Sequence, residues 1–211
     1  MQVYQRLLKS KIMYNRKQIE DAVLCKGYKW FENGDYNLNI VGVRNSNTNQ
    51  EITNKFDDKV TVSYSVNGEL KYEEWDATTD PGIYYSENLL NPDGVAILKP
   101  NQYRSTYQIG LHQGKYEALT QKLPVEVYRD NNRDDEYNLN EYSLQEGMFG
   151  INIHKAGSRV NGSTQIDKWS AGCQVFSKEN DFNHLMELAH KASNLYGNSF
   201  TYTLIESKDL V

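Results

Sequence analysis

The chain of 211 residues lacks several features that would assign it to a class at once. Its two cysteines are too few for a disulfide scaffold. No apolar run exceeds four residues, whereas a transmembrane helix needs about 20, so we expect no membrane span. Lys and Arg number 23 against 28 Asp and Glu, which gives a net charge of −5 without any basic run. Because nucleic-acid binding needs a concentrated basic surface, we expect no nucleic-acid partner.

An ordinary soluble composition accompanies these absences. Hydrophobic residues make up 38% of the chain and charged residues 24%, which suffices for a packed core at this length. The opening residues show no apolar centre and no small-residue cleavage pattern, so we expect no export signal. The length favours one compact domain with a small appendage, and the sequence carries no signal for an oligomeric state.

Residues 1–35 are expected to form an N-terminal helical extension. Asn15 followed three positions later by Gln18 resembles a capping box, an apolar stripe at helical spacing follows, and Gly27 supplies a stop. Residues 36–211 form the second predicted unit, which carries the strands and the candidate catalytic residues.

Short runs of alternating polar and apolar residues predict a mainly β body. Asn67-Gly68 lies between two such runs, and this dipeptide is the strongest short-range signal of a β-hairpin. An amphipathic helix that runs from Phe182 to Tyr196 is expected to pack on the sheet. The predicted fold is therefore a β-rich sandwich or barrel with one packed helix. The predicted strands cover residues 36–44, 59–66, 69–77, 95–99, 103–110, 124–129, 149–154 and 199–205.

Cys173 and His154 are the residues that best fit catalytic chemistry. A nucleophilic cysteine needs a base within hydrogen-bonding reach and donors aimed at the oxyanion that forms on attack. His154 ends an alternating strand and is the candidate base, while Gly172 permits a tight turn whose amides at 172 and 173 are candidate oxyanion donors. Ser170 is expected to fix that turn through its hydroxyl. A small buried cysteine without a catalytic role is the alternative.

The order of these residues resembles the catalytic domain of the L,D-transpeptidases. That family has a His-x-x-Gly element followed by Ser-His-Gly-Cys, and the matching residues here are His154, Gly157, Ser170, Gly172 and Cys173. The resemblance covers roughly residues 36–205, and the segments 78–82 and 91–104 look like the family's upstream region. Ala171 stands where the family usually has a second histidine, and Gln174-Val175 replaces a common Ile-Arg pair.

The resemblance implies an enzyme that acts on peptidoglycan stem peptides and requires no cofactor. Cys173 attacks the carbonyl of the third-position diamino acid, the D-residue leaves as an amine, and a thioester forms, with His154 as a base oriented by a backbone carbonyl. Water then gives an L,D-carboxypeptidase or endopeptidase, whereas an amine acceptor gives a cross-linking transpeptidase. The lack of an export signal and the altered motif favour a hydrolytic phage-type lysin, freed from the host cytoplasm at lysis or carried by the virion.

Four further residues are candidate substrate contacts: Arg104, His112, Gly157 and Trp169. Arg104 and His112 offer positive charge or hydrogen-bond donors for a stem-peptide carboxylate. A solvated loop around these positions is the alternative interpretation.

An acidic stretch between β-like segments has the spacing of a calcium loop. Such loops place oxygen ligands at positions 1, 3, 5, 9 and 12 and use a backbone carbonyl at position 7. Asp135 occupies the sixth position, where these loops use glycine. A structural Ca²⁺ site is one interpretation, and an acidic surface loop without metal is the other. The candidate ligands are Asp130, Asn132, Asp134, Glu136, Asn138 and Glu141.

Two other functions compete with this interpretation, and the order of Cys and His argues against the first. A papain-like peptidase also uses Cys and His, but its Cys precedes its His, and the only histidines after Cys173 lie within one predicted helix. A non-catalytic wall-binding or virion module of the same fold is the second alternative, because Ala171 and Gln174 alter the motif.

Overall fold

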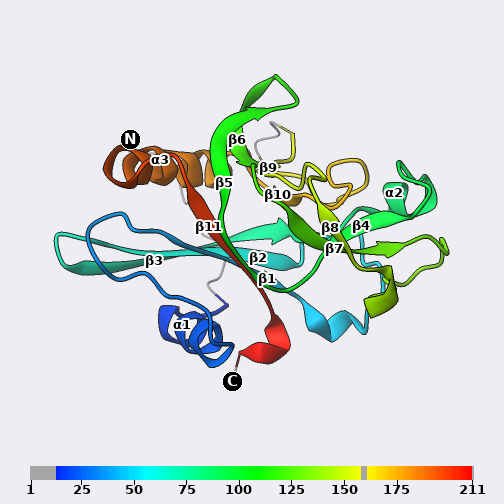
Figure 1. Ribbon diagram of the computed structural model, residues 1–211, viewed down its shortest axis with the longest axis horizontal. Coiled ribbons are helices and arrows are strands. Elements are labelled where there is room, and N and C mark those ends of the chain that lie inside the picture. The colour runs from blue at the N-terminus through cyan, green and yellow to red at the C-terminus, as the bar shows by residue number, and fades with distance from the viewer. Residues whose placement is uncertain (1–12, 158–160, 211) are drawn as a thin grey trace, which may run out of the picture.

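The computed structural model describes residues 13–157 and 161–210, and strands dominate it. The strands are β1 (Asn39–Arg44), β2 (Asp58–Val66), β3 (Glu69–Thr78), β4 (Val95–Leu98), β5 (Gln102–His112), β6 (Tyr116–Gln121), β7 (Val125–Asp130), β8 (Gln145–Gly147), β9 (Ile153–Lys155), β10 (Gln174–Phe176) and β11 (Phe200–Glu206). Eight of them close into a barrel in the order β1-β11-β5-β6-β9-β10-β3-β2, and β4-β7-β8 form a separate sheet (Figure 1). The predicted mainly β fold class is confirmed.

Three α-helices and three short 3₁₀ turns complete the described chain. The helices are α1 (Arg16–Cys25), α2 (Ile83–Glu87) and α3 (Glu179–Tyr196), and the turns are η1 (Ser46–Thr48), η2 (Glu141–Ser143) and η3 (Ser207–Asp209). The predicted capping box is present, because the Asn15 side chain accepts the Gln18 backbone N–H and the Gln18 side chain accepts the Asn15 N–H. Residues 1–12 of the predicted extension lie outside the described residues. No helix of the described part is long and apolar enough to cross a membrane.

The hairpin predicted at Asn67-Gly68 joins β2 and β3. Val66 pairs with Glu69, and the two turn residues have φ angles of 52° and 80°. Positive φ at both central positions is the geometry that Asn-Gly favours, and its twist matches the flanking strands. This turn fixes the register of the longest antiparallel pair in the barrel.

Alternating residues of β1 divide the core between two helices. Ile40 points into the central cluster that holds Phe182 and Leu185 of α3, while Val41 packs with Ile19 of α1. Figure 1 shows α1 and α3 on opposite sides of β1, β2 and β3. Burial of each such side chain stabilises the folded state by about 1.5–3 kcal/mol. Packing on both faces of β1 therefore contributes to stability. The helix α1 therefore shares a core with the barrel.

Several elements escaped the sequence analysis. The strands β6, β8 and β10 and the short helix α2 were not among the predicted elements. β8 and β10 have three residues each, too few to show alternation, and β10 is buried at every position. The predicted strand at 149–154 begins only at Ile153, because Gly150 has φ +72°, which interrupts the extended backbone.

Candidate active site

The parallel pairing of β9 with β10 brings the two candidate catalytic residues to one place. His154 is the central residue of β9 and pairs with Val175, while Ile153 pairs with Gln174. Cys173 directly precedes β10. The barrel therefore fixes the backbone of His154 on one strand and that of Cys173 at the start of its neighbour, although 19 positions separate them in the sequence.

His154 is held as a neutral base. Its Nδ1 lies 2.8 Å from the main-chain oxygen of Lys155 and 3.3 Å from the Tyr116 hydroxyl, which itself donates to the same carbonyl at 3.4 Å. Because a carbonyl only accepts and is the nearer partner, Nδ1 carries the proton and Nε2 keeps its lone pair. The side chain is 4% exposed, and burial together with the neighbouring ring of His112 lowers the pKa of His154 to about 4. A backbone carbonyl rather than a carboxylate thus orients the imidazole, as the sequence analysis predicted.

Cys173 is a neutral thiol in this structure. Its Sγ accepts the Asn152 N–H at 3.4 Å and donates to the Gly150 carbonyl at 3.4 Å. Burial raises the pKa of the Cys173 thiol to about 11, against the opposing effect of the Asn152 N–H. Within the described residues no hydrogen bond joins Sγ to His154, although sequence reasoning placed the base within hydrogen-bonding reach of the sulfur. The main chain of the 150–152 segment takes its place.

The turn before β10 is tied by Ser170, as predicted. Ser170 Oγ accepts the Gly172 N–H at 3.1 Å and donates to the Cys173 carbonyl at 2.8 Å. The Gly172 N–H is therefore engaged, which corrects its assignment as an oxyanion donor and leaves the Cys173 N–H as the candidate of the two. Gly172 itself has φ +117°, and a Cβ there would clash with the Ala96 carbonyl oxygen.

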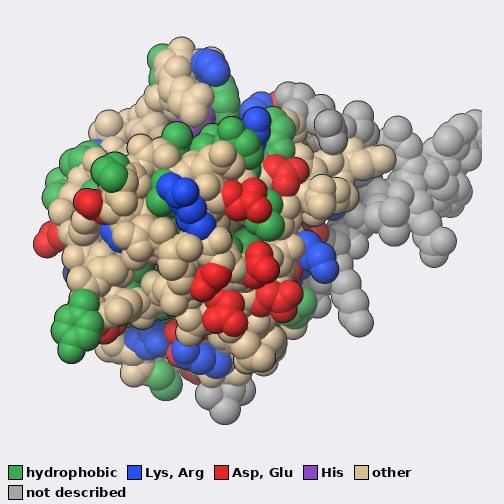
Figure 2. Space-filling model, turned by 90° about the vertical axis from the view of Figure 1, so that its right-hand side faces the viewer, with side chains coloured by type: hydrophobic (Ala, Val, Ile, Leu, Met, Phe, Trp, Pro, Cys, Tyr) green, Lys and Arg blue, Asp and Glu red, His purple; other side chains and the backbone are tan. Residues whose placement is uncertain are grey.

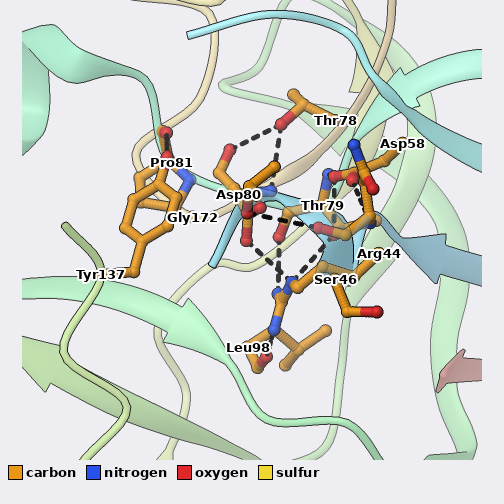
Figure 3. A network of polar contacts seen from close by, with 12 residues as sticks. Arg44, Ser46, Asp58, Thr78, Thr79, Asp80, Pro81, Leu98, Tyr137 and Gly172 are labelled. Atoms are coloured by element: carbon orange, nitrogen blue, oxygen red, sulfur yellow. Dashed lines mark hydrogen bonds and ion pairs between the residues drawn. The ribbon is translucent and has the colours of Figure 1, made fainter. Parts of the chain in front are cut away.

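A buried polar network around Arg44 lies next to the turn that contains Gly172 (Figure 3). The Arg44 guanidinium donates to the Thr79 hydroxyl and carbonyl and to the Leu98 carbonyl, and it pairs with Asp80 at 2.8 Å. Asp58 accepts the backbone N–H of Thr79 at 2.6 Å and its hydroxyl at 2.9 Å. The segment 78–82 is thereby fixed against the barrel.

The same segment contacts the cysteine turn directly. The Gly82 N–H donates to the Ser170 carbonyl at 2.9 Å, and the Gln174 side-chain amide approaches the Thr79 carbonyl at 3.4 Å. The Tyr202 hydroxyl donates to Oε1 of the same Gln174 side chain at 2.7 Å. Sequence reasoning missed Arg44, and the available signal was a charged residue at the end of an otherwise apolar run.

A cavity of about 490 Å³ opens beside His154. Its walls include three of the predicted substrate contacts, namely His112, Gly157 and Trp169. The Trp169 ring packs so closely on Gly157 that a Cβ at that position would come within 2.9 Å of it, while the tryptophan stays 42% exposed. The glycine therefore allows an aromatic wall at this place.

Positive charge gathers along the cavity. The remaining walls include Tyr85, Gln113, Lys115, Tyr116, Lys155, Ala156 and Lys168. Lys155 pairs with Glu179, whereas Lys115 and Lys168 make no ion pair in the part of the chain that the structure describes. Arg104 does not belong here, because it lines a separate cavity of about 150 Å³ with Phe31. The predicted grouping of Arg104 with His112 is wrong, since the two residues lie far apart along β5.

The predicted calcium ligands run from Asp130, the last residue of β7, through an irregular segment to Glu141, the first residue of η2. The segment follows β7, which pairs with β4. Figure 2 shows the face of the molecule that carries α2 and β4, and acidic side chains gather on this face. Asp130 is buried, accepts the Asn138 N–H at 3.2 Å and has a pKa raised by burial.

Hydrogen bonds within the segment occupy several of the predicted ligands. The Asn132 amide donates to Asp134 at 2.7 Å, the Glu136 N–H donates to Asp134 at 2.9 Å, and Glu141 accepts from the Tyr128 hydroxyl at 3.0 Å. Among the described residues, no group of three or more His, Cys, Asp or Glu side chains is placed to hold a metal ion. The calcium site stays a prediction.

Comparisons with known proteins add no relative. No family model, no curated protein and no solved structure matched this chain.

Proposed function

We propose that this protein is a cysteine-dependent enzyme that cleaves peptidoglycan stem peptides at the L,D bond after the third-position diamino acid. The observation that carries the proposal is the placement of Cys173 beside the strand that holds His154, with the His154 Nδ1–H engaged by a backbone carbonyl and its Nε2 bare. A neutral imidazole with a free Nε2 is the form that accepts a proton from a nucleophile.

The reaction begins with attack of the sulfur on the substrate carbonyl, and the thiol proton is transferred in the same step. Nε2 of His154 takes the proton from Sγ of Cys173 as the sulfur attacks the carbonyl carbon, and the C–N bond of the resulting tetrahedral species breaks. The proton passes from Nε2 to the leaving amine of the D-residue, and a thioester remains on Cys173. Water, deprotonated by the same Nε2, then attacks the thioester and releases a free carboxylate and the thiol.

The cavity next to His154 suits an anionic peptide. Stem peptides carry carboxylates, and Lys115 and Lys168 stand exposed on the cavity walls without a carboxylate partner among the described residues. Charge-assisted hydrogen bonds to carboxylates are roughly twice as strong as neutral ones. The exposed ring of Trp169 offers an apolar surface for the aliphatic part of a stem-peptide side chain.

Digestion of defined muropeptides tests the proposal. The wild-type protein should release the terminal D-residue from a tetrapeptide and cleave cross-linked dimers, and mass spectrometry should detect the tripeptide product. Cys173→Ala should abolish both products, while Cys25→Ala should leave them unchanged because that cysteine is exposed on α1, away from the site. Product formation by Cys173→Ala would refute the proposed nucleophile.

The fate of the thioester decides between hydrolysis and cross-linking. We place hydrolysis first, as in a phage-type lysin that reaches the wall at lysis or from the virion. Accumulation of cross-linked dimers without loss of the terminal D-residue would instead identify an L,D-transpeptidase.

A non-catalytic wall-binding or virion module is a second candidate. The observation that favours it is the neutral Cys173 thiol, which is hydrogen-bonded to the main chain instead of the imidazole. A carbapenem-type acylating agent separates the two candidates. An enzyme should form a covalent adduct at Cys173 that depends on His154, whereas a binding module should form none.

A further inference from the structure

A second imidazole lies directly against His154. His112, the last residue of β5, stacks on it with ring centroids 4.1 Å apart and an interplanar angle of 22°. Both rings line the cavity of about 490 Å³. His112 is 8% exposed, so its ring is fixed by packing. The acyl-transfer steps above give this residue no task.

The side chain of Asn152 determines which nitrogen of His112 carries the proton. Its Oδ1 accepts the Gln121 backbone N–H at 2.9 Å, so its Nδ2 is the atom that faces His112 Nδ1 at 3.1 Å. An amide nitrogen only donates, and Nδ1 must therefore be an acceptor without a proton. Neutral His112 consequently carries its proton on Nε2.

The two stacked rings are thus held in opposite tautomers. His154 has its proton on Nδ1 and a lone pair on Nε2, whereas His112 has its lone pair on Nδ1 and its proton on Nε2. Among the residues that the structure describes, the one hydrogen bond of the His112 ring is that of Nδ1, and Nε2 makes none. The pair therefore offers one base and one unused donor at the same cavity.

A positive charge on His112 is unfavourable because its ring is buried and lies near the positive charge of Lys115. The titratable groups around it are His154 on β9, Tyr116 on β6 and Lys115 in the hairpin between β5 and β6. Burial and then Lys115 lower the pKa of His112, and protonation of Nδ1 would also break the hydrogen bond from Asn152. His112 therefore stays a neutral donor.

Asn152 also contacts the nucleophile. Its backbone N–H donates to Cys173 Sγ at 3.4 Å while its side chain holds His112. One residue between Gly150 and β9 thus couples the position of the sulfur to the tautomer of the second imidazole.

We propose that Asn152 is a positioning residue that locks His112 as a neutral imidazole, and that His112 donates its Nε2–H to a carbonyl or carboxylate oxygen of the bound stem peptide. The inference rests on the proposed function for the identity of the ligand. The tautomer itself is a property of the protein without ligand.

Nitrogen NMR of the imidazole side chains tests the tautomer without any turnover. The chain has four histidines, so the spectrum of the uniformly labelled protein is simple to assign by single substitutions. Wild type should show His112 with a bare Nδ1 and a protonated Nε2. The isosteric Asn152→Asp places a carboxylate oxygen against Nδ1 and should move a proton onto it. A protonated Nδ1 in wild type, or identical spectra for both proteins, would overturn the proposal.

Ligand binding and kinetics test the donor role. In Cys173→Ala, addition of a stem tetrapeptide should shift the His112 Nε2–H resonance, and an unmoved resonance in a saturated complex would overturn the donor role. In the active protein His112→Phe keeps a stacked ring without a donor and should lower kcat/KM about tenfold or more, whereas His112→Gln, which keeps a donor, should retain more activity. His190→Phe, at an exposed site on α3, is the matched control.

The two proposals fail in different ways. If wild type releases no product and takes up no carbapenem while the tetrapeptide still shifts His112 Nε2–H, the proposed reaction is wrong and the donor role stands. If product forms but His112→Phe matches wild type, the reaction stands and the donor role is wrong.

Discussion

The ionisation state of Cys173 is open to a direct test by alkylation at different pH values. With a thiol pKa of about 11, the thiolate fraction at pH 7 is about 10⁻⁴. An unperturbed cysteine with a pKa near 8.5 has about 3% thiolate at the same pH. Because only the thiolate reacts with iodoacetamide, Cys173 should be alkylated about 300-fold more slowly than a free-cysteine peptide at pH 7. The rate should rise about tenfold per pH unit up to pH 10.

The assay uses a Cys25→Ser protein, so that Cys173 is the only thiol, and follows the mass of the adduct over time. His154→Gln should leave the slope unchanged, because an imidazole with a pKa of about 4 is already neutral above pH 6 and cannot stabilise a thiolate by charge. A rate that is fast and flat between pH 5 and pH 8 in wild type, and that His154→Gln slows, would reveal a thiolate–imidazolium pair. That result would refute the neutral resting state that burial of the two side chains implies.

Three further predictions concern stability and metal binding. The pKa of His154 is about 4 in the folded state and about 6.5 unfolded, so the unfolded state binds more protons between these values, and the contribution of His154 to the free energy of unfolding should fall by roughly 2–3 kcal/mol from pH 7 to pH 4.5. Burial raises the pKa of Asp58 to about 7, which acts in the opposite sense over the same range, so urea titrations should show the His154 loss as the difference between wild type and His154→Gln. Gly172→Ala should lose at least about 2 kcal/mol and all activity, while Gly114→Ala, which also has positive φ but no atom near its Cβ, should cost only about 1 kcal/mol. Millimolar Ca²⁺ should raise the melting temperature of wild type and not of Asp130→Ala, and equal melting with and without Ca²⁺ would remove the site.

The sequence predicted those parts of the fold that depend on patterns within a short stretch of the chain. Asn67-Gly68 needs positive φ at both residues, and α3 repeats its apolar residues at helical spacing, so a short window suffices for each. By contrast, β10 is recognised as a strand only through its partners β3 and β9, because all three of its residues are buried. Closure of the barrel is a property of these long-range pairings.

The candidate site divides in the same way. Ser170 and Gly172 act within one tight turn, and sequence reasoning predicted the role of the Ser170 hydroxyl. Arg104 was misplaced because it and His112 share β5 but lie near opposite ends of that strand. Asn152 was missed because its role requires Gln121 and His112, which lie on two other strands. No spacing along the chain encodes such a three-way contact.

The neutral resting state limits how the proposed reaction can proceed. Moving the proton from Cys173 to His154 against pKa values of about 11 and about 4 costs roughly 10 kcal/mol. A thiolate and an imidazolium brought to about 4 Å would attract each other by about 4 kcal/mol at an effective dielectric constant of about 20. The remaining cost of roughly 6 kcal/mol is a large share of the barrier of about 13–17 kcal/mol that typical turnover numbers allow.

Proton transfer is therefore expected to accompany carbon–sulfur bond formation instead of preceding it. The carbonyl must then be polarised before the sulfur attacks, because no preformed thiolate drives the step. With the Gly172 N–H engaged by Ser170, two neutral donors are proposed for that polarisation, the Cys173 N–H and the Nε2–H of His112. Because neither the thiol nor the imidazole carries a charge before the attack, the step depends on donors that are already in place, which is the role that the Asn152 side chain gives to His112.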